Sequence, residues 1–140
     1  MKKQFSFWSL VMILALCVGF TSCKDDEPSF KGNIVGKWQL VEIIDSDGSQ
    51  TEANPGDWYE ACDFKGHLEI KTGGTLDEFD ACSNSTFSGT WKLEGDKLTM
   101  TYNEFPIPLT YTVTTLTENE LVKTIRIMGE TATSKFKRIN

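Results

Sequence analysis

Four cysteines carry the most reactive side chains in the sequence: Cys17, Cys23, Cys62 and Cys82. A thiol can form a disulfide, ligate a metal, act as a nucleophile or accept a lipid, and its surroundings decide which. Cys62 and Cys82 flank a predicted β-hairpin turned by Gly73-Gly74, so the two thiols fall at its open end. Zinc binding is not expected there, because the chain has no CxxC motif and only one histidine. This placement favours a structural disulfide.

The N-terminal 22 residues have the composition of an export signal. Two lysines precede an unbroken apolar run at 10–18, and small residues, Thr21 and Ser22, stand directly before Cys23. This pattern resembles the lipobox of bacterial lipoproteins, in which the cysteine receives a diacylglyceryl group and becomes the first residue after cleavage. The resemblance implies that residues 1–22 are removed and that lipid is attached at Cys23. Export also takes the chain to an oxidising compartment, where a disulfide can form.

Residues 23–33 are predicted to form the lipidated N-terminus and a polar tether to the folded domain. The sequence Lys-Asp-Asp-Glu at 24–27 resembles the acidic tag that directs lipoproteins of Bacteroidetes to the cell surface. Together with the lipobox, this run predicts a protein held in the outer membrane by its lipid and exposed at the cell surface. Two alternatives remain open: a plain signal peptide cut at another position, and an uncleaved membrane anchor.

The charge of the chain excludes some classes of partner. The chain has 14 basic and 20 acidic residues, for a formal net charge of −6. The predicted signal contains two lysines and no acids, so the part from Cys23 onward has a charge of −8. Nucleic acids are not expected as partners, because their binding depends on Lys and Arg contacts with phosphates. After the signal, no apolar stretch is long enough for a membrane span.

Residues 34–140 are predicted to form one all-β domain. The region lacks helical periodicity and is rich in threonine, β-branched and aromatic residues separated by turn signals. Strands are predicted at residues 35–44, 67–72, 75–81, 86–93, 97–102, 109–116, 120–128 and 131–139, with a long loop at 45–61. Eight strands joined by hairpins favour an antiparallel up-and-down β-barrel, because pairing the last strand with the first removes exposed edges. A β-sandwich is the alternative.

Two motifs add a family resemblance to this β pattern. Gly36-Lys37-Trp38 resembles the G-x-W motif that opens the first strand of lipocalins, and Gly89-Thr90-Trp91 with its following hairpin resembles the short lipocalin-like lipoprotein domains of Bacteroidetes. The resemblance implies an eight-stranded lipocalin-like β-barrel. It also implies that a basic residue of the last strand, here Arg138, packs over Trp38. Gly36, Trp38 and Arg138 are therefore the expected barrel-closing residues.

Strand alternation predicts which side chains line the barrel interior. The expected interior residues, which would also line a ligand cavity, are Phe79, Phe87, Trp91, Met100, Tyr102 and Tyr111. An eight-stranded barrel encloses either a packed core or room for one small ligand, and bulky aromatic side chains suit both. In the first strand the apolar alternation changes phase between Leu40 and Val41, which predicts a bulge or bend.

These features favour non-catalytic binding of a small apolar or amphipathic ligand inside the barrel, with no cofactor and no metal. The alternative is a structural or accessory protein-interaction module with a filled core, using the loop around Trp58 and Tyr59. An enzyme is not expected, because no nucleophile–base pair can be assembled around His67, and its alternation with Leu68 predicts an exposed position. A group of acids near the cysteines is expected to form a solvated surface: Asp63, Asp77, Glu78 and Asp80.

Overall fold

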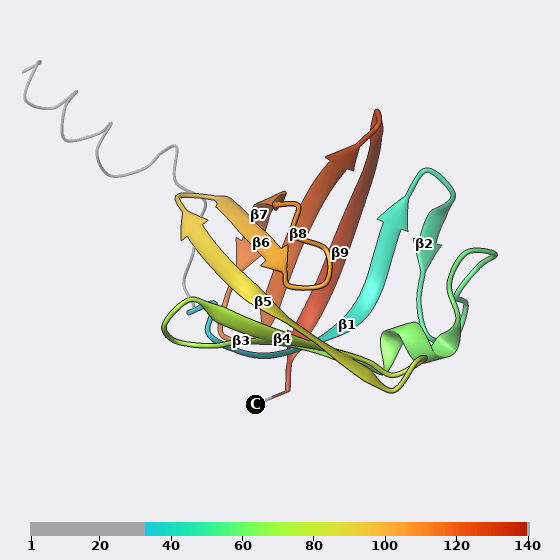
Figure 1. Ribbon diagram of the computed structural model, residues 1–140. Coiled ribbons are helices and arrows are strands. Elements are labelled where there is room, and N and C mark those ends of the chain that lie inside the picture. The colour runs from blue at the N-terminus through green and yellow to red at the C-terminus, as the bar shows by residue number, and fades with distance from the viewer. Residues whose placement is uncertain (1–32, 140) are drawn as a thin grey trace, which may run out of the picture.

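A computed structural model describes residues 33–139 and shows an all-β fold built from antiparallel strands (Figure 1). The strands are β1 (Gly36–Asp45), β2 (Gly48–Gln50), β3 (His67–Ile70), β4 (Thr75–Asp80), β5 (Ser85–Glu94), β6 (Lys97–Tyr102), β7 (Leu109–Leu116), β8 (Glu120–Ile127) and β9 (Glu130–Arg138). A short 3-10 helix, η1 (Ala61–Phe64), precedes β3. Within the described residues, no helix is long and apolar enough to cross a membrane.

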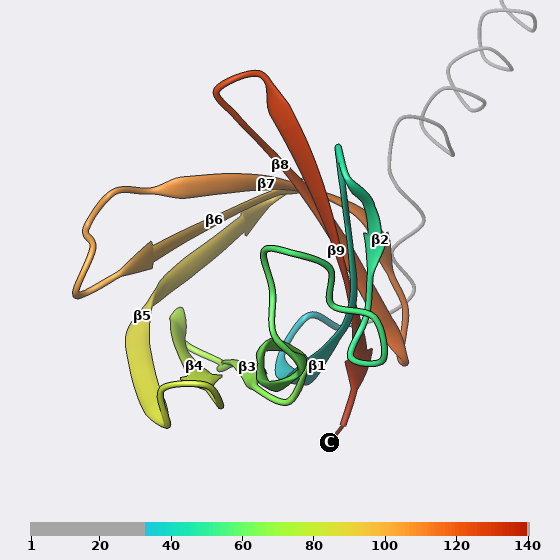
Figure 2. The same cartoon turned by 90° about the vertical axis from the view of Figure 1, so that its right-hand side faces the viewer.

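The sheet closes on itself and forms an eight-stranded barrel. Each strand from β3 to β8 pairs with the next one along the chain, and β1 pairs with both β3 and β9. Figure 2 shows the strands arranged in a ring around the interior. The predicted up-and-down barrel is therefore confirmed, and the β-sandwich alternative is wrong.

One strand was not expected from the sequence. The predicted loop at 45–61 contains β2, which turns back on the end of β1 and pairs with Ile43, Ile44 and Asp45. The first half of β1, Gly36–Gln39, pairs instead with β3. A segment of three residues is too short to show an alternating pattern, which is why the sequence did not reveal it.

A bulge in β1 explains the phase change in its sequence. The pairing of β1 with β9 shifts register between Leu40 and Glu42, so one extra residue is accommodated at Val41. Val41 is exposed, whereas Ile43 is buried after the shift. The bulge therefore brings Ile43 to the same inner face as Trp38 and Leu40, as the sequence pattern predicted.

One end of the barrel is filled by packed apolar side chains. The buried core cluster comprises Ile34, Trp38, Leu68, Ile70, Leu76, Leu98, Met100, Val113, Leu116, Leu121 and Phe136. Gly89 of β5 allows β6 to come close, because a Cβ at this position would lie 2.1 Å from the backbone oxygen of Thr101. Trp38 is at the centre of this packing and is fully buried.

Arg138 covers Trp38 and ties together three parts of the chain. Its guanidinium carbon lies 4.2 Å from the centroid of the Trp38 ring, and the indole N–H donates to the backbone oxygen of Ile34 at 2.8 Å. The guanidinium also donates to the backbone oxygens of Val35 at 2.8 Å and Glu118 at 2.6 Å. Arg138 thus joins the end of β9 to the segment before β1 and to the β7–β8 turn.

Replacing Arg138 should destabilise the barrel more than replacing its neighbour. We expect Arg138→Met to lower the free energy of unfolding by about 2–4 kcal/mol, because it removes several charged hydrogen bonds and the cation–π contact. Lys137→Met is the matched control, since Lys137 is exposed on the other face of β9. Urea denaturation of both variants checks this expectation. Equal stability losses would show that the closure does not depend on the guanidinium.

Candidate functional site

The other end of the barrel interior is hollow. Two adjoining cavities, of about 310 and 380 Å³, open to solvent there. They share five lining residues from five strands, namely Leu68, Glu78, Phe87, Lys123 and Phe136. Because these residues border both cavities, the two spaces are parts of one site. An eight-stranded barrel encloses either packed side chains or space for one small ligand, and these cavities are the part of the interior that side chains do not fill.

The remaining lining residues give each cavity a different character. The first cavity is also lined by Leu40, Ile43, Tyr59, Asp63, Gly66, His67, Phe79, Asp80 and Ser134. The second is also lined by Tyr102, Glu104, Phe105, Leu109 and Tyr111. The surface of the first cavity is about equally polar and apolar, whereas the surface of the second is mostly apolar or aromatic with a few polar groups. The composition of the second cavity is the usual one of a site for a small molecule.

Lys123 of β8 is the most unusual residue in the site. Its side chain is buried on the inner face, where its ammonium lies 3.4 Å from the centroid of the Tyr111 ring and 5.4 Å from that of Phe136. Burial lowers the pKa of the ammonium to about 8, and the negative charge of Glu78 opposes part of this change. The aromatic faces provide part of the stabilisation that water would otherwise give the cation.

Glu78 of β4 is the second charged residue that borders both cavities. It pairs across the strands with the core residue Leu68 and therefore belongs to the inner face. The Tyr102 hydroxyl donates a hydrogen bond to the Glu78 carboxylate. Burial, followed by the charge of Glu78, raises the pKa of the Tyr102 hydroxyl, and the same causes raise that of Tyr111 to about 12. Both phenols are therefore protonated, and able to donate, at neutral pH.

The expected interior residues divide between the cavity and the core. Phe87, Tyr102 and Tyr111 line the cavity. Met100 is buried in the core, and Trp91 packs against the core while its indole N–H donates to the backbone oxygen of Lys71 at 2.8 Å. Aromatic residues of the predicted inner face thus serve both purposes, and the barrel is filled at one end and open at the other.

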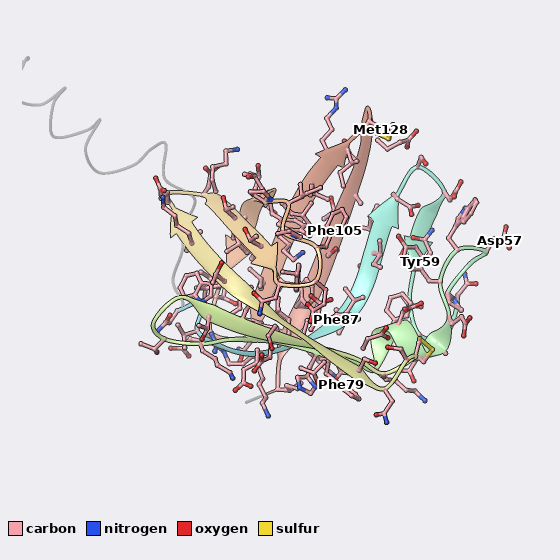
Figure 3. The ribbon with its side chains drawn as sticks, viewed as in Figure 1. Asp57, Tyr59, Phe79, Phe87, Phe105 and Met128 are labelled. Atoms are coloured by element: carbon pink, nitrogen blue, oxygen red, sulfur yellow. A yellow bond between two sulfur atoms is a disulfide. The ribbon has the colours of Figure 1, made fainter. Side chains whose placement is uncertain are left out.

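Phe79 lines the first cavity as expected, but it lies on the opposite face of β4 from the inward-facing Glu78. It pairs with His67, and the two rings stack with centroids 5.4 Å apart. This pair lies on the face of β4 opposite to Glu78, and Figure 3 shows Phe79 and Phe87 on opposite sides of the β4–β5 hairpin. Successive residues of a strand point to opposite faces, so Phe79 and Glu78 cannot both face the interior. Glu78 therefore faces the barrel interior, whereas Phe79 borders the first cavity from the opposite face of the strand.

The acids that were expected to form one solvated surface have separate environments. Asp77 pairs with Lys71 and accepts from Ser88 on the outer face. Asp63 and Asp80 lie beside Cys82. Glu78 departs from the expectation because it faces the cavity. Alternation within β4, with Leu76 and Glu78 on one face and Asp77 on the other, accounts for this difference.

The structure places the remaining predicted site residues as follows. Cys62 of η1 and Cys82 after β4 form a disulfide with a Cα–Cα distance of 5.1 Å. Gly36 begins β1 with a φ of 149°, and Trp38 follows it beneath Arg138. Cys23, the predicted lipid attachment site, lies outside the described residues, as do the predicted signal and most of the tether.

Sequence reasoning missed Lys123, although one signal was available. In β8, Leu121, Lys123 and Ile125 occupy alternate positions, so the lysine falls in phase with two apolar residues. Val122 obscured this pattern, because it is apolar and is itself largely buried. A lysine in the apolar phase of a barrel strand predicts an inward-facing charge.

The buried charge of Lys123 should make stability depend on pH. Its pKa falls from an ordinary 10.5 to about 8 in the folded protein. Below pH 8, where the lysine is charged in both the folded and the unfolded chain, this shift lowers the free energy of unfolding by an amount on the order of 3 kcal/mol. Between pH 8 and 10.5 the unfolded chain binds the proton more readily, so the free energy of unfolding rises with pH.

We therefore expect Lys123→Met to have a higher free energy of unfolding than the natural protein at pH 7, by up to about 3 kcal/mol. This difference should shrink by pH 10. Urea denaturation of both proteins at pH 7, 8, 9 and 10 measures the difference. Both proteins keep the same tyrosines, so the titration of these residues affects the comparison little. A difference that stays constant with pH would contradict the assigned cause.

Comparisons with known proteins agree with this architecture. The family model for the lipocalin-like domain matches residues 34–123, which is more than half of the chain. Among solved structures, a lipocalin-like protein from Bacteroides uniformis is similar, with a TM-score of 0.56 and 19% sequence identity. The match covers 77% of this chain and 100% of that one. No curated protein matches the chain. The chain belongs to the lipocalin-like domain family.

Proposed function

We propose that this protein is a non-catalytic binding protein that holds a small apolar or amphipathic molecule in the hollow end of its barrel. The observation that carries the proposal is the pair of adjoining cavities bordered by Leu68, Phe87 and Phe136. Transfer of apolar ligand surface from water to such walls is favourable, at about 25 cal/mol per Å². The lipocalin-like family assignment supports a binding role in the same direction.

A non-catalytic role is supported by the environment of the histidine. His67 is the only histidine of the chain, and its ring borders the first cavity, where it stacks on Phe79 rather than on a side chain that could act as a nucleophile. The charged groups that border both cavities, Lys123 and Glu78, are engaged with an aromatic ring and a phenol. Their arrangement suits the orientation of a bound molecule, because a few polar groups in an apolar cavity fix how a ligand lies.

A second candidate is the accessory protein-interaction module. It is favoured by large apolar side chains exposed in loops, since Trp58 is 79% exposed and Met128 is 97% exposed. Met128 lies at the tip of the β8–β9 hairpin, which projects beyond the rest of the barrel (Figure 3). Scattered exposed apolar residues are common on protein surfaces, whereas a cavity of this size needs a specific arrangement of side chains. Ligand binding is therefore the preferred function.

A neutral apolar dye should enter the cavity and be excluded when the cavity is filled. We expect Nile red to fluoresce on binding to the purified natural protein. In Ser134→Phe the affinity should fall by about ten-fold or more, because Ser134 lines the first cavity and the new ring occupies the space of the dye. Fluorescence titration measures both affinities.

Thr131→Phe is the matched control, because Thr131 is exposed on the same strand and adds the same ring outside the cavity. Native mass spectrometry of protein purified from its own membrane should also reveal a co-purifying small molecule. Absence of both the dye signal and a co-purifying molecule would contradict ligand binding and favour the interaction module.

We also propose that lipid on Cys23 anchors the protein in the outer membrane. Two acyl chains hold a protein stably in a membrane where one does not. The part from Cys23 onward has a charge of −8, so electrostatic attraction to an anionic membrane surface does not hold it there.

Loss of the thiol should release the exported protein. We expect Cys23→Ala to move from the membrane fraction to the soluble fraction, whereas Cys17→Ala stays with the membrane. Cys17 is the matched control, because it lies within the apolar run of the predicted signal. Fractionation with immunoblotting measures the distribution. An exported Cys23→Ala variant that is still bound to the membrane would refute the anchor.

A further inference from the structure

We propose that the ligand of the barrel cavity is an amphipathic carboxylate, whose acidic group lies against Lys123 and whose apolar tail fills the aromatic part of the cavity. This inference rests on the proposed ligand-binding function and deepens it by naming the chemical class of the ligand. It is carried by the geometry of Lys123 and by the difference between Lys123 and the other charged residue of the site.

Lys123 is buried, yet it lacks an anionic partner. Its side chain borders both cavities and its residue is 6% exposed. Within residues 33–139, the ion pairs of the structure involve other lysines. Gln50 Oε1 is the fully buried side-chain polar atom without a partner in these residues, so the Lys123 nitrogen is not sealed in the core and can be reached from the cavity. The contact that it makes is with the face of Tyr111. A buried cation without a hydrogen-bond acceptor is costly, so a group that supplies one is bound strongly.

Glu78 does not form an ion pair with Lys123, and its carboxylate already accepts a hydrogen bond from another residue. The carboxylate accepts a hydrogen bond from the Tyr102 hydroxyl, and it does not lie within salt-bridge distance of the Lys123 ammonium. Of the two charged groups that border both cavities, the anion therefore has a donor and the cation has no acceptor. A ligand that adds an anion meets this need, whereas a ligand cation would face the unpartnered lysine and be repelled.

The surroundings of Lys123 indicate that the rest of the ligand is apolar. Leu68, Phe87 and Phe136 border both cavities together with Lys123, and Leu40 and Leu109 extend the apolar surface on either side. A chain of about ten carbons fits cavities of about 310 and 380 Å³ without displacing the packed core. These walls favour an unbranched or flexible hydrocarbon tail over a polar one.

The affinity for a carboxylate should depend on the protonation of Lys123. The other titratable groups that line the site are Tyr59, Glu78, Tyr102, Tyr111, Asp63, His67, Asp80 and Glu104, and burial raises the pKa of the Tyr59 hydroxyl. The Lys123 ammonium has a pKa of about 8, and that of Tyr111 is about 12. Raising the pH from 7 to 10 therefore removes the lysine charge while the buried phenols stay protonated. The affinity for the anion falls, whereas that for an uncharged ligand stays the same.

The experiment compares sodium decanoate with 1-decanol, which has the same tail and no charge. Each ligand displaces Nile red from the natural protein, from Lys123→Met and from Lys92→Met. Lys92 is the matched control, because its ammonium pairs with Glu94 on the exposed face of β5. The ratio of the decanol to the decanoate dissociation constant should fall about ten-fold or more in Lys123→Met and stay unchanged in Lys92→Met.

Measuring the binding of both ligands to the natural protein at pH 7 and pH 10 tests the role of Lys123 even if Lys123→Met loses its affinity for Nile red. Weaker decanoate binding at pH 10 than at pH 7, with unchanged decanol binding, supports the proposal. Equal ratios in the natural protein and Lys123→Met, with no effect of pH, overturn it while leaving the ligand-binding function intact. If neither ligand nor Nile red binds the natural protein, the proposed function fails together with this inference.

Discussion

The pairing of β1 with β9 is the constraint on which the rest of the structure depends. It closes the ring of strands, so that the inner faces of all eight strands meet in one enclosed space. One strand, β1, serves two neighbours along its length, because β3 pairs with its first half and β2 with its end. Trp38 and the apolar cluster fill the end where β1 pairs with β3, and Arg138 covers that end from the outside. Because these packed side chains fill only one end of the barrel, the rest of the interior remains open as the cavities.

Lys123 shows how a stable barrel and a functional cavity make opposite demands on one residue. A barrel optimised for stability alone has apolar residues at every inward position, because burial of a charge is unfavourable. The site instead holds a cation over the face of Tyr111 and a carboxylate that is bonded to Tyr102. Strongly shifted pKa values gather where buried charges are arranged for a task, and here they gather around the cavity. The charged groups at the cavity therefore carry a cost in stability that an apolar interior would avoid.

Much of the fold could be predicted from the sequence, whereas the site could be predicted only in part. Long alternating strands and short hairpin turns fixed the barrel order, and the change of phase after Leu40 revealed the bulge. Alternation also gave Phe87, Tyr102 and Tyr111 as interior residues. It did not reveal that in β4 the acidic Glu78 faces the interior, while Phe79 borders the first cavity from the opposite face of the strand. Whether aromatic side chains fill a barrel or line a cavity depends on three-dimensional packing, which no local pattern contains.

The attachment of η1 has a consequence for the thermodynamics of binding. Phe64 of η1 is buried, its backbone oxygen accepts from the Gln39 side chain at 3.0 Å, and the Cys62–Cys82 disulfide joins the same helix to the segment after β4. Tyr59 and Asp63, which line the first cavity, are thereby held by three independent restraints. The conformational entropy of this part of the cavity lining is lost when the chain folds and not when a ligand binds. This part of the cavity lining is thus preorganised, so ligand binding does not have to order it.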